Sequence, residues 1–191
     1  YDAVRKATGT QKINTLFVTH WHPEQVGLNE RARGDGATVI SHAITQAFLK
    51  NKVDSPLVKG GSFGPLSANG LPNKTFRKDD SLEFAGQKVV YGYLPAAHTN
   101  GDLFVYFPAL NVLVAGGAVG TESWPVLDYR NGGIFIGMVK AHEKLAAIVK
   151  PDTVVVPSIG RTETGADLVQ QRDMYQRLFQ DMNFMKIGRA H

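Results

Sequence analysis

The sequence of 191 residues contains no cysteine. Disulfides, thiolate metal sites and cysteine nucleophiles are therefore excluded. The compartment stays open, because a chain without cysteine suits both an oxidising and a reducing environment. Long apolar runs are lacking too: none approaches the roughly 20 residues that a membrane span requires. We therefore expect no membrane-spanning segment.

A strong excess of charge of one sign is also lacking. The chain has 21 lysines and arginines against 17 acidic residues, which gives a formal net charge of +4. The basic residues are scattered, and a solvated face explains the one loose group, Lys74, Arg77 and Lys78, better than a nucleic-acid-binding surface. We expect no nucleic-acid partner. The 43% hydrophobic and 20% charged fractions are those of an ordinary globular protein, and the length fits a single domain over residues 1–191.

The order of apolar patterns predicts a mixed α/β fold. Apolar runs that end in glycine or polar residues predict buried strands, at 15–20, 37–42, 102–108, 111–117 and 153–157. Short alternating runs with turn residues between them predict antiparallel strands, at 74–77, 81–86 and 87–95. Helical spacing predicts helices, at 24–36, 43–51, 133–149 and 165–183.

A long irregular segment separates the first elements from the antiparallel strands. Residues 54–73 are rich in glycine, proline and serine, which predicts a loop rather than a helix or strand. Loops of this length inside a compact domain are often functional or mobile. We expect this one to cover a substrate if the protein is an enzyme.

The first strand ends on two histidines in the stretch "FVTHWHPEQVG". Residues at i and i+2 of a strand point to the same side, so His20 and His22 present both imidazoles together while Trp21 points away. Pro23 has no N–H and ends the strand, so the pair should open into a loop. Taken alone, such a pair is more simply explained as two polar residues at the end of a strand, with no role in metal binding. Two ligands of one metal ion are the alternative.

The other histidines differ in what surrounds them. His98 lies in "LPAAHTNGD", a loop between two strands, where small neighbours leave room for a metal or a substrate. His142 falls on the apolar face of the 133–149 helix and is best explained as a packed core residue, and His42 begins a helix as a cap or rim residue. His20, His22 and His98 together would make a site of three histidines with one open position, the catalytic arrangement for zinc.

Four motifs in this order resemble the metallo-β-lactamase superfamily: "THWHPEQVGLNE", "AAHTNGDLFVYFP", "NVLVAGG" and "TVVVPSIG…ADLVQQRDMYQRL". The similarity runs from Ile13 to about Met182. It implies an αββα sandwich with metals held by loops along one edge. The family pattern His-x-His-x-Asp-His is met here by His20, His22, Glu24 and Gln25, and the family's third histidine by His98. The motif "HT-x-GD" is similar to that of a periplasmic or secreted subgroup of metal-dependent hydrolases.

This chain departs from the family pattern where a second metal would bind. A Gly-Asp pair in the family supplies a bridging carboxylate, and Gly116 and Gly117 stand there. A family Gly-His-Gly is replaced by the segment 158–160, Ser-Ile-Gly, and the family Asp-His pair by Glu24 and Gln25. The resemblance therefore implies that the second metal site is lost and the first retained, with one zinc, or another transition metal, per chain on the three histidines.

The amino-terminal region is short for this family. Members carry about two or more strands before the His-x-His strand, and here only residues 1–14 precede it. Without those strands an apolar sheet face would be open. We expect either that the chain is the carboxyl-terminal part of a longer protein, or that a second copy or a partner segment covers that face.

Two functions of different classes fit these residues. In one, the protein is a single-zinc hydrolase of a small ester, lactone or lactam, in which Glu24 orients a water or acts as general base. In the other, it is a non-catalytic metal-binding or protein-interaction member of the same fold, because losing the second metal removes electrostatic stabilisation. Candidate partners of the ligating imidazoles are Asp102, Asp128 and Gln25. A turn-capping role is the alternative for both aspartates.

Overall fold

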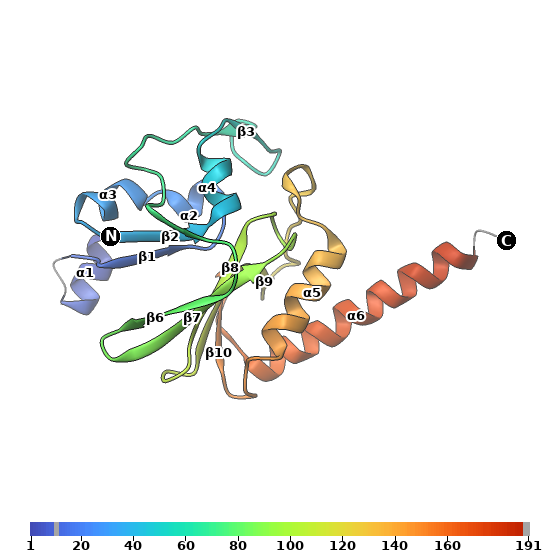
Figure 1. Cartoon of the computed structure of the whole chain (residues 1–191). Coiled ribbons are helices and arrows are strands. Elements are labelled where there is room, and N and C mark those ends of the chain that lie inside the picture. The colour runs from blue at the N-terminus through green and yellow to red at the C-terminus, as the bar shows by residue number, and fades with distance from the viewer. Residues whose placement is uncertain (10–11, 189–191) are drawn as a thin grey trace. The chain divides into compact units, whose positions relative to one another are not determined.

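The protein was described from a computed structural model, which covers residues 1–9 and 12–188 (Figure 1). Its contacts divide the chain into two compact units, Tyr1–Lys78 and Asp79–His191. Each unit has its own sheet and its own cluster of buried apolar side chains. The units are therefore described one after the other.

The first unit contains a small parallel sheet of three strands. The sheet has the order β1-β2-β5, and both of its strand pairs are parallel. Parallel neighbours require crossover connections, and short helices supply them between β1 and β2 and after β2. The elements of this unit are α1 (Asp2–Thr8), β1 (Thr15–Val18), α2 (Pro23–Val26), α3 (Asn29–Gly34), β2 (Thr38–His42), α4 (Ala43–Leu49), β3 (Val53–Asp54), β4 (Ser62–Phe63) and β5 (Lys74–Phe76).

Trp21 lies in the core of the first unit. Its side chain has no exposed surface and packs in the cluster that includes Val18, Val39 and Leu49. The indole stacks on the ring of Phe48, with the centroids 5.6 Å apart. Burying a side chain of this size stabilises the unit by roughly 1.5–3 kcal/mol or more. The chain has left strand β1 at this point, and the indole also contacts the ring of His22, with the centroids 4.5 Å apart.

The second unit contains a six-stranded mixed sheet with the order β11-β10-β9-β8-β7-β6. Strands β6 to β9 form an antiparallel meander, whereas β9 and β10 are parallel and α5 lies in the connection between them. The elements are β6 (Asp80–Phe84), β7 (Gln87–Leu94), β8 (Asp102–Phe107), β9 (Val112–Gly120), the 3₁₀ turn η1 (Tyr129–Asn131), α5 (Phe135–Ala146), β10 (Val154–Ile159), β11 (Glu163–Thr164) and α6 (Gly165–Gly188).

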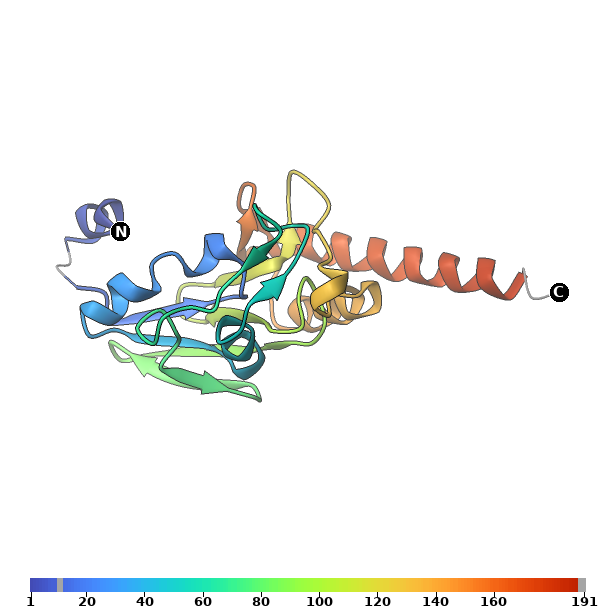
Figure 2. The ribbon, with the colours of Figure 1, turned by 90° about the horizontal axis from the view of Figure 1, so that it is seen from above.

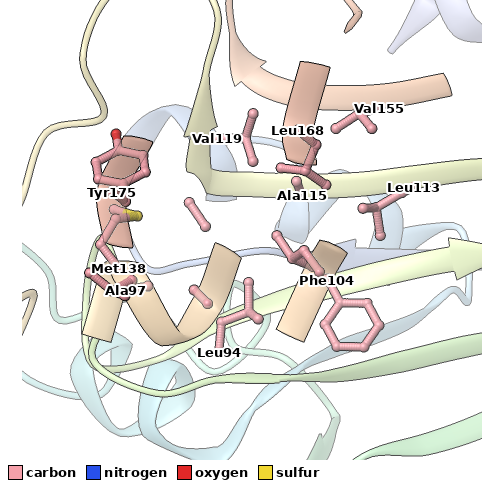
Figure 3. Close-up of a cluster of buried hydrophobic side chains, with 14 residues drawn as sticks. Leu94, Ala97, Phe104, Leu113, Ala115, Val119, Met138, Val155, Leu168 and Tyr175 are labelled. Carbon is pink, nitrogen blue, oxygen red and sulfur yellow. The ribbon is translucent and has the colours of Figure 1, made fainter. Parts of the chain in front are cut away.

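Helices α5 and α6 pack against the sheet of the second unit. Figure 3 shows the buried cluster they share with it: Leu94, Phe104 and Leu113 come from strands, and Met138, Leu168 and Tyr175 from the two helices. The carboxyl-terminal part of α6 extends beyond the strands of its own unit (Figure 2). Among the described residues, no helix is long and apolar enough to cross a membrane.

The mixed α/β character predicted from the sequence is confirmed, and two details were wrong. The strand predicted at 74–77 is β5, which pairs parallel with β2 rather than antiparallel with its sequence neighbours. The irregular segment 54–73 contains β4, which pairs with β3 in a short antiparallel ribbon. In both cases the pairing depends on where the chain returns in space, which a local pattern does not encode.

Two histidines have the structural roles that their sequence positions predicted. The His42 side chain caps α4 by accepting a hydrogen bond from the Ile44 N–H. The His142 side chain is fully buried, and its Nδ1 lies 3.0 Å from the Met138 carbonyl oxygen.

The carboxyl of Glu163 in β11 sits in an unfavourable environment for a charge. Its Oε2 accepts a hydrogen bond of 2.7 Å from Gln171 Nε2, while Oε1 is buried without a hydrogen-bond partner. Burial, and then the nearby negative charge of Asp167, raise the pKa of Glu163 from 4.5 to about 7. The unfolded chain therefore releases this proton at a lower pH than the folded one does.

This difference predicts a pH-dependent contribution to stability. A raised carboxyl pKa stabilises the folded state at low pH, and that contribution is lost as the pH rises from about 4.5 to about 7. The variant Glu163→Gln keeps an acceptor for Gln171 but has no carboxyl to titrate. In thermal unfolding, its Tm relative to that of the parent protein should rise as the pH increases across this range and should stay constant above it. The exposed Asp181→Asn is the control. A Tm difference for Glu163→Gln that is constant from pH 4.5 to 8 would refute the prediction.

Candidate metal-binding residues and their environment

His20 and His22 lie where β1 gives way to α2, as the sequence predicted. Strand β1 ends at Val18, and His22 is the N-cap of α2 in an extended conformation (φ −61°, ψ 150°), with Pro23 as the first helical residue. The two rings meet edge to face, with their centroids 5.0 Å apart, and both side chains are buried. Pro23 suits the first helical position because its missing N–H would be unpaired there in any case.

A short hydrogen-bond chain orients the ring of His20. The Thr19 hydroxyl donates to Gln25 Oε1 over 3.3 Å, and its oxygen lies 3.2 Å from His20 Nδ1. Since the hydroxyl proton is directed at Gln25, the Thr19 oxygen accepts from Nδ1–H. Nδ1 of His20 is thus engaged within the first unit, and its Nε2 faces Glu24. Gln25 stands at a position where the family carries a histidine. Here it helps to orient the His20 ring through its hydrogen bond with Thr19.

Glu24 faces both imidazoles of this unit. Its Oε1 lies 3.8 Å from His20 Nε2 and also 3.8 Å from His22 Nδ1, while the side chain as a whole is 57% exposed. The interaction with the His20 side chain is the largest cause that lowers the pKa of Glu24 to about 2, against an opposing effect of partial burial. The carboxylate is therefore ionised at neutral pH, and it points at the two nitrogens.

His98 lies in the second unit, in the loop between β7 and β8, and its ring is held from two sides. On one side, Nδ1 forms a short hydrogen bond with the Val126 carbonyl oxygen. A carbonyl only accepts, so Nδ1 carries the proton and the lone pair is on Nε2. On the other side the ring lies against Gly117 of β9, where a Cβ would come within 2.4 Å of His98 Cδ2.

The backbone around His98 is held as firmly as its ring. The His98 carbonyl accepts from the Asp128 N–H over 2.9 Å, and the Ala96 carbonyl accepts from the Ile134 N–H over 2.9 Å. Gly137, in the first turn of α5, lets the helix approach this loop, because a Cβ there would lie 1.9 Å from the Ala96 oxygen. The segment 126–137 therefore fixes the position of the loop that carries His98.

Asp102 and Asp128 lie close to His98 and make turn-forming hydrogen bonds. The fully buried Asp102 accepts from the Thr99 N–H (2.8 Å) and hydroxyl (2.7 Å). Burial raises the pKa of Asp102 to about 6, opposed by His98 and by the Thr99 bonds. The Asp128 carboxylate accepts from Asn131 Nδ2 at 3.0 and 2.9 Å. These bonds hold the turns on either side of the imidazole.

The structure thus gathers the expected residues into two groups. His20, His22, Glu24 and Gln25 lie together in the first unit, and His98, Asp102 and Asp128 lie together in the second. Each of the three histidines offers an imidazole nitrogen as a metal ligand.

Three contributors were not predicted from the sequence. Thr19 could have been suspected, because a hydroxyl beside a ligating histidine is a common partner. The Val126 carbonyl gives no signal, since every residue has a backbone oxygen. The sequence marked Gly117 only as the position where the family's bridging carboxylate is missing. It did not show that this glycine leaves space for the His98 ring.

At the positions of the family's bridging carboxylate and last histidine, the side chains of this chain have no ligand atom. Gly116 adopts a positive φ of 56°, and Gly117 contacts the His98 ring as described. Ile159, at the position of the last family histidine, is 64% exposed. The donor set that fits a metal ion is therefore the set of histidine nitrogens, which suits zinc and other first-row transition metals.

Comparisons with known proteins agree with these motifs. The family model described as the Metallo-beta-lactamase superfamily matches residues 3–175. A search of the curated proteins found no match.

Solved structures share the fold. A metallo-beta-lactamase from Pontibacter korlensis is 22% identical with a TM-score of 0.70, over 91% of this chain and 74% of that one. The metallo-beta-lactamase IND-7 is 22% identical with a TM-score of 0.67, over 92% and 73% of the two chains. The B3 metallo-beta-lactamase BLEG-1 is 17% identical with a TM-score of 0.71, over 86% and 79%. By its sequence over residues 3–175 and by its fold, the chain belongs to the metallo-β-lactamase superfamily.

Proposed function

We propose that this protein is a metal-dependent hydrolase with a single metal ion bound by His20, His22 and His98, acting on a small ester, lactone or lactam. The observation that supports the proposal most directly is the orientation of the imidazoles. His20 and His98 each use Nδ1 in a hydrogen bond within their own unit, which leaves Nε2 as the ligand atom. Second partners of this kind are typical of metal-ligating histidines, because they fix the tautomer and the ring orientation.

The chemistry of the donor set supports zinc as the metal. Three neutral imidazoles leave one of four tetrahedral positions open, as in catalytic zinc sites. When bound there, zinc lowers the pKa of a coordinated water toward about 7 and acts as a Lewis acid. The superfamily is metal-dependent, and the residues present at the second-metal positions, Gly117 and Ile159 among them, favour one metal per chain.

The residues of the chain would then bind the substrate and direct the water. Glu24, whose Oε1 lies 3.8 Å from a nitrogen of each of two proposed ligands, would accept a hydrogen bond from a water held at the metal. It would orient that water or take its proton as general base. Thr19 and Gln25 hold the His20 ring, and the Val126 carbonyl holds the His98 ring.

A non-catalytic metal-binding protein is the second candidate, and the altered second-metal positions favour it. Gly117 and Ile159 offer no side-chain ligand where the family binds its second metal. The loss of a second metal also removes a source of electrostatic stabilisation for a tetrahedral intermediate, which in enzymes is worth several kcal/mol. The two candidates share the metal site and differ only in turnover.

The metal site predicts a stoichiometry. Elemental analysis of protein purified and then dialysed should give one transition-metal equivalent per chain, and His98→Ala should lose it, because two histidines hold the metal far less tightly than three. His42→Asn is the matched control: it removes another buried histidine but keeps a capping side chain for α4. Two equivalents in the parent protein, or full retention in His98→Ala, would contradict the proposal.

The role of Glu24 predicts a separation of turnover from metal binding. Glu24→Gln should keep the fold and the metal but reduce hydrolysis by about 10²- to 10⁴-fold, because an amide orients and activates a water poorly. Glu83→Gln, an exposed carboxyl on β6, is the control.

Hydrolysis should be assayed on a panel of esters, lactones and lactams. Unchanged activity in Glu24→Gln would leave Glu24 as a residue of the first turn of α2 only. Loss of the metal in that variant would instead make Glu24 a ligand. If the parent protein binds its metal and hydrolyses nothing in the panel, the non-catalytic candidate replaces the hydrolase.

A further inference from the structure

We propose that Gly117 is a positioning residue for the metal ligand His98: the absence of a side chain at 117 creates the space that the imidazole occupies. This inference rests on the proposed function for the role of His98, and it concerns a residue outside the ligand set. It reverses the reading of Gly117 as merely the place of a lost carboxylate.

The contact between Gly117 and His98 leaves no room for any side chain. A Cβ on Gly117 would lie 2.4 Å from His98 Cδ2, 2.8 Å from Cγ and 3.1 Å from Nε2. Separations below 3.0 Å are essentially never found for real Cβ atoms. Cγ is the root of the ring rather than a flexible end, so the whole imidazole would have to move.

Neither partner of this contact is free to move away. Strand β9 pairs with β8 at Val112–Val114 and with β10 at Gly116 and Gly120, so Gly117 lies between two residues that are paired with β10. On its far side the His98 ring is held by the Val126 carbonyl through Nδ1. Turning the ring away from a side chain at 117 would therefore break the hydrogen bond that fixes its tautomer.

Backbone conformation does not explain the glycine at 117. Gly116 has a positive φ of 56°, a conformation that favours glycine by itself. Gly117 is not among the glycines with positive φ, and a residue with a side chain could adopt its backbone conformation. The two adjacent glycines are therefore required for different reasons. Gly116 allows the positive φ of the backbone, and Gly117 leaves space for the imidazole of His98.

Restoring the family's aspartate at 117 would not restore a second metal site. The family carries a bridging carboxylate at the second position of this pair, which is Gly117 here. With His98 placed as it is, an aspartate at 117 would meet the imidazole before it reached a metal. Gly117→Asp should therefore lose the first metal rather than gain a second.

The experiment measures zinc affinity by chelator competition, and zinc content by elemental analysis, in the parent protein, Gly117→Ala, Gly117→Asp and Gly34→Ala. Gly34 is the control because a Cβ there meets nothing within 4 Å and its φ is not positive. We expect Gly117→Ala to bind zinc about 10- to 100-fold more weakly, the range found when groups that support a ligand are altered. We expect Gly34→Ala to match the parent. The nitrogen NMR signals of His98 should change in Gly117→Ala, because the Nδ1 hydrogen bond is lost.

A double-mutant cycle on the metal-free protein separates this clash from a general defect of β9. Gly117→Ala should lower the Tm when His98 is present, and should lower it much less in a His98→Ala background, where the ring is gone. Equal losses of Tm in the two backgrounds would overturn the proposal, and so would parent-like zinc affinity in Gly117→Ala. Two zinc equivalents in Gly117→Asp would also overturn it. A parent protein that binds no zinc would refute the proposed function alone, since the cycle still decides whether Gly117 makes room for the ring.

Discussion

The hydrogen bond between His98 Nδ1 and the Val126 carbonyl is the constraint on which the candidate site depends. It decides which nitrogen keeps a lone pair, and it holds the ring against β9. The Val126 carbonyl can do this only because the segment that follows is itself fixed, through the Asp128 N–H on the His98 carbonyl and the Ile134 N–H on the Ala96 carbonyl. A backbone acceptor at this place therefore determines what a side chain in another loop can bind.

His20 and His98 each engage Nδ1 in a hydrogen bond, by different means. His20 Nδ1 contacts the hydroxyl of Thr19, which in turn donates a hydrogen bond to the side chain of Gln25, and all three residues lie close together in the sequence. His98 uses a backbone carbonyl 28 residues away. The hydrogen bonds of the local arrangement involve only residues 19, 20 and 25. The distant one requires that a crossover connection be folded before the imidazole is oriented.

The sequence predicted much of the fold, for physical reasons that can be named, and it marks His20, His22 and His98 as candidate ligands. Strand β1 ends at Val18, just before the His-x-His pair, and α2 begins at Pro23, as the apolar run and the proline predict. The packing of His142 follows from helical spacing. The parallel pairing of β5 could not be predicted, because strand direction depends on how the chain returns.

The surroundings of the site were the harder part. The partner of His98 is a backbone oxygen, which no residue type marks, and the importance of Gly117 lies in atoms that are absent. Patterns of side chains can mark candidate ligands. They do not mark the space and the backbone groups that hold those side chains.

The parallel pairing of β9 with β10 also bears on the order in which the second unit is assembled. Strands β6 to β9 connect to one another by short turns and can pair early, whereas β10 must wait for the connection at 121–153 to close. The groups that anchor His98, Val126 and Asp128 among them, lie in that late connection. Opening of the connection alone would free the imidazole while the meander stayed intact. Amide hydrogens of the loop around His98 would then exchange with solvent sooner than those of β7 and β8, which places the candidate ligand in the less protected part of its own unit.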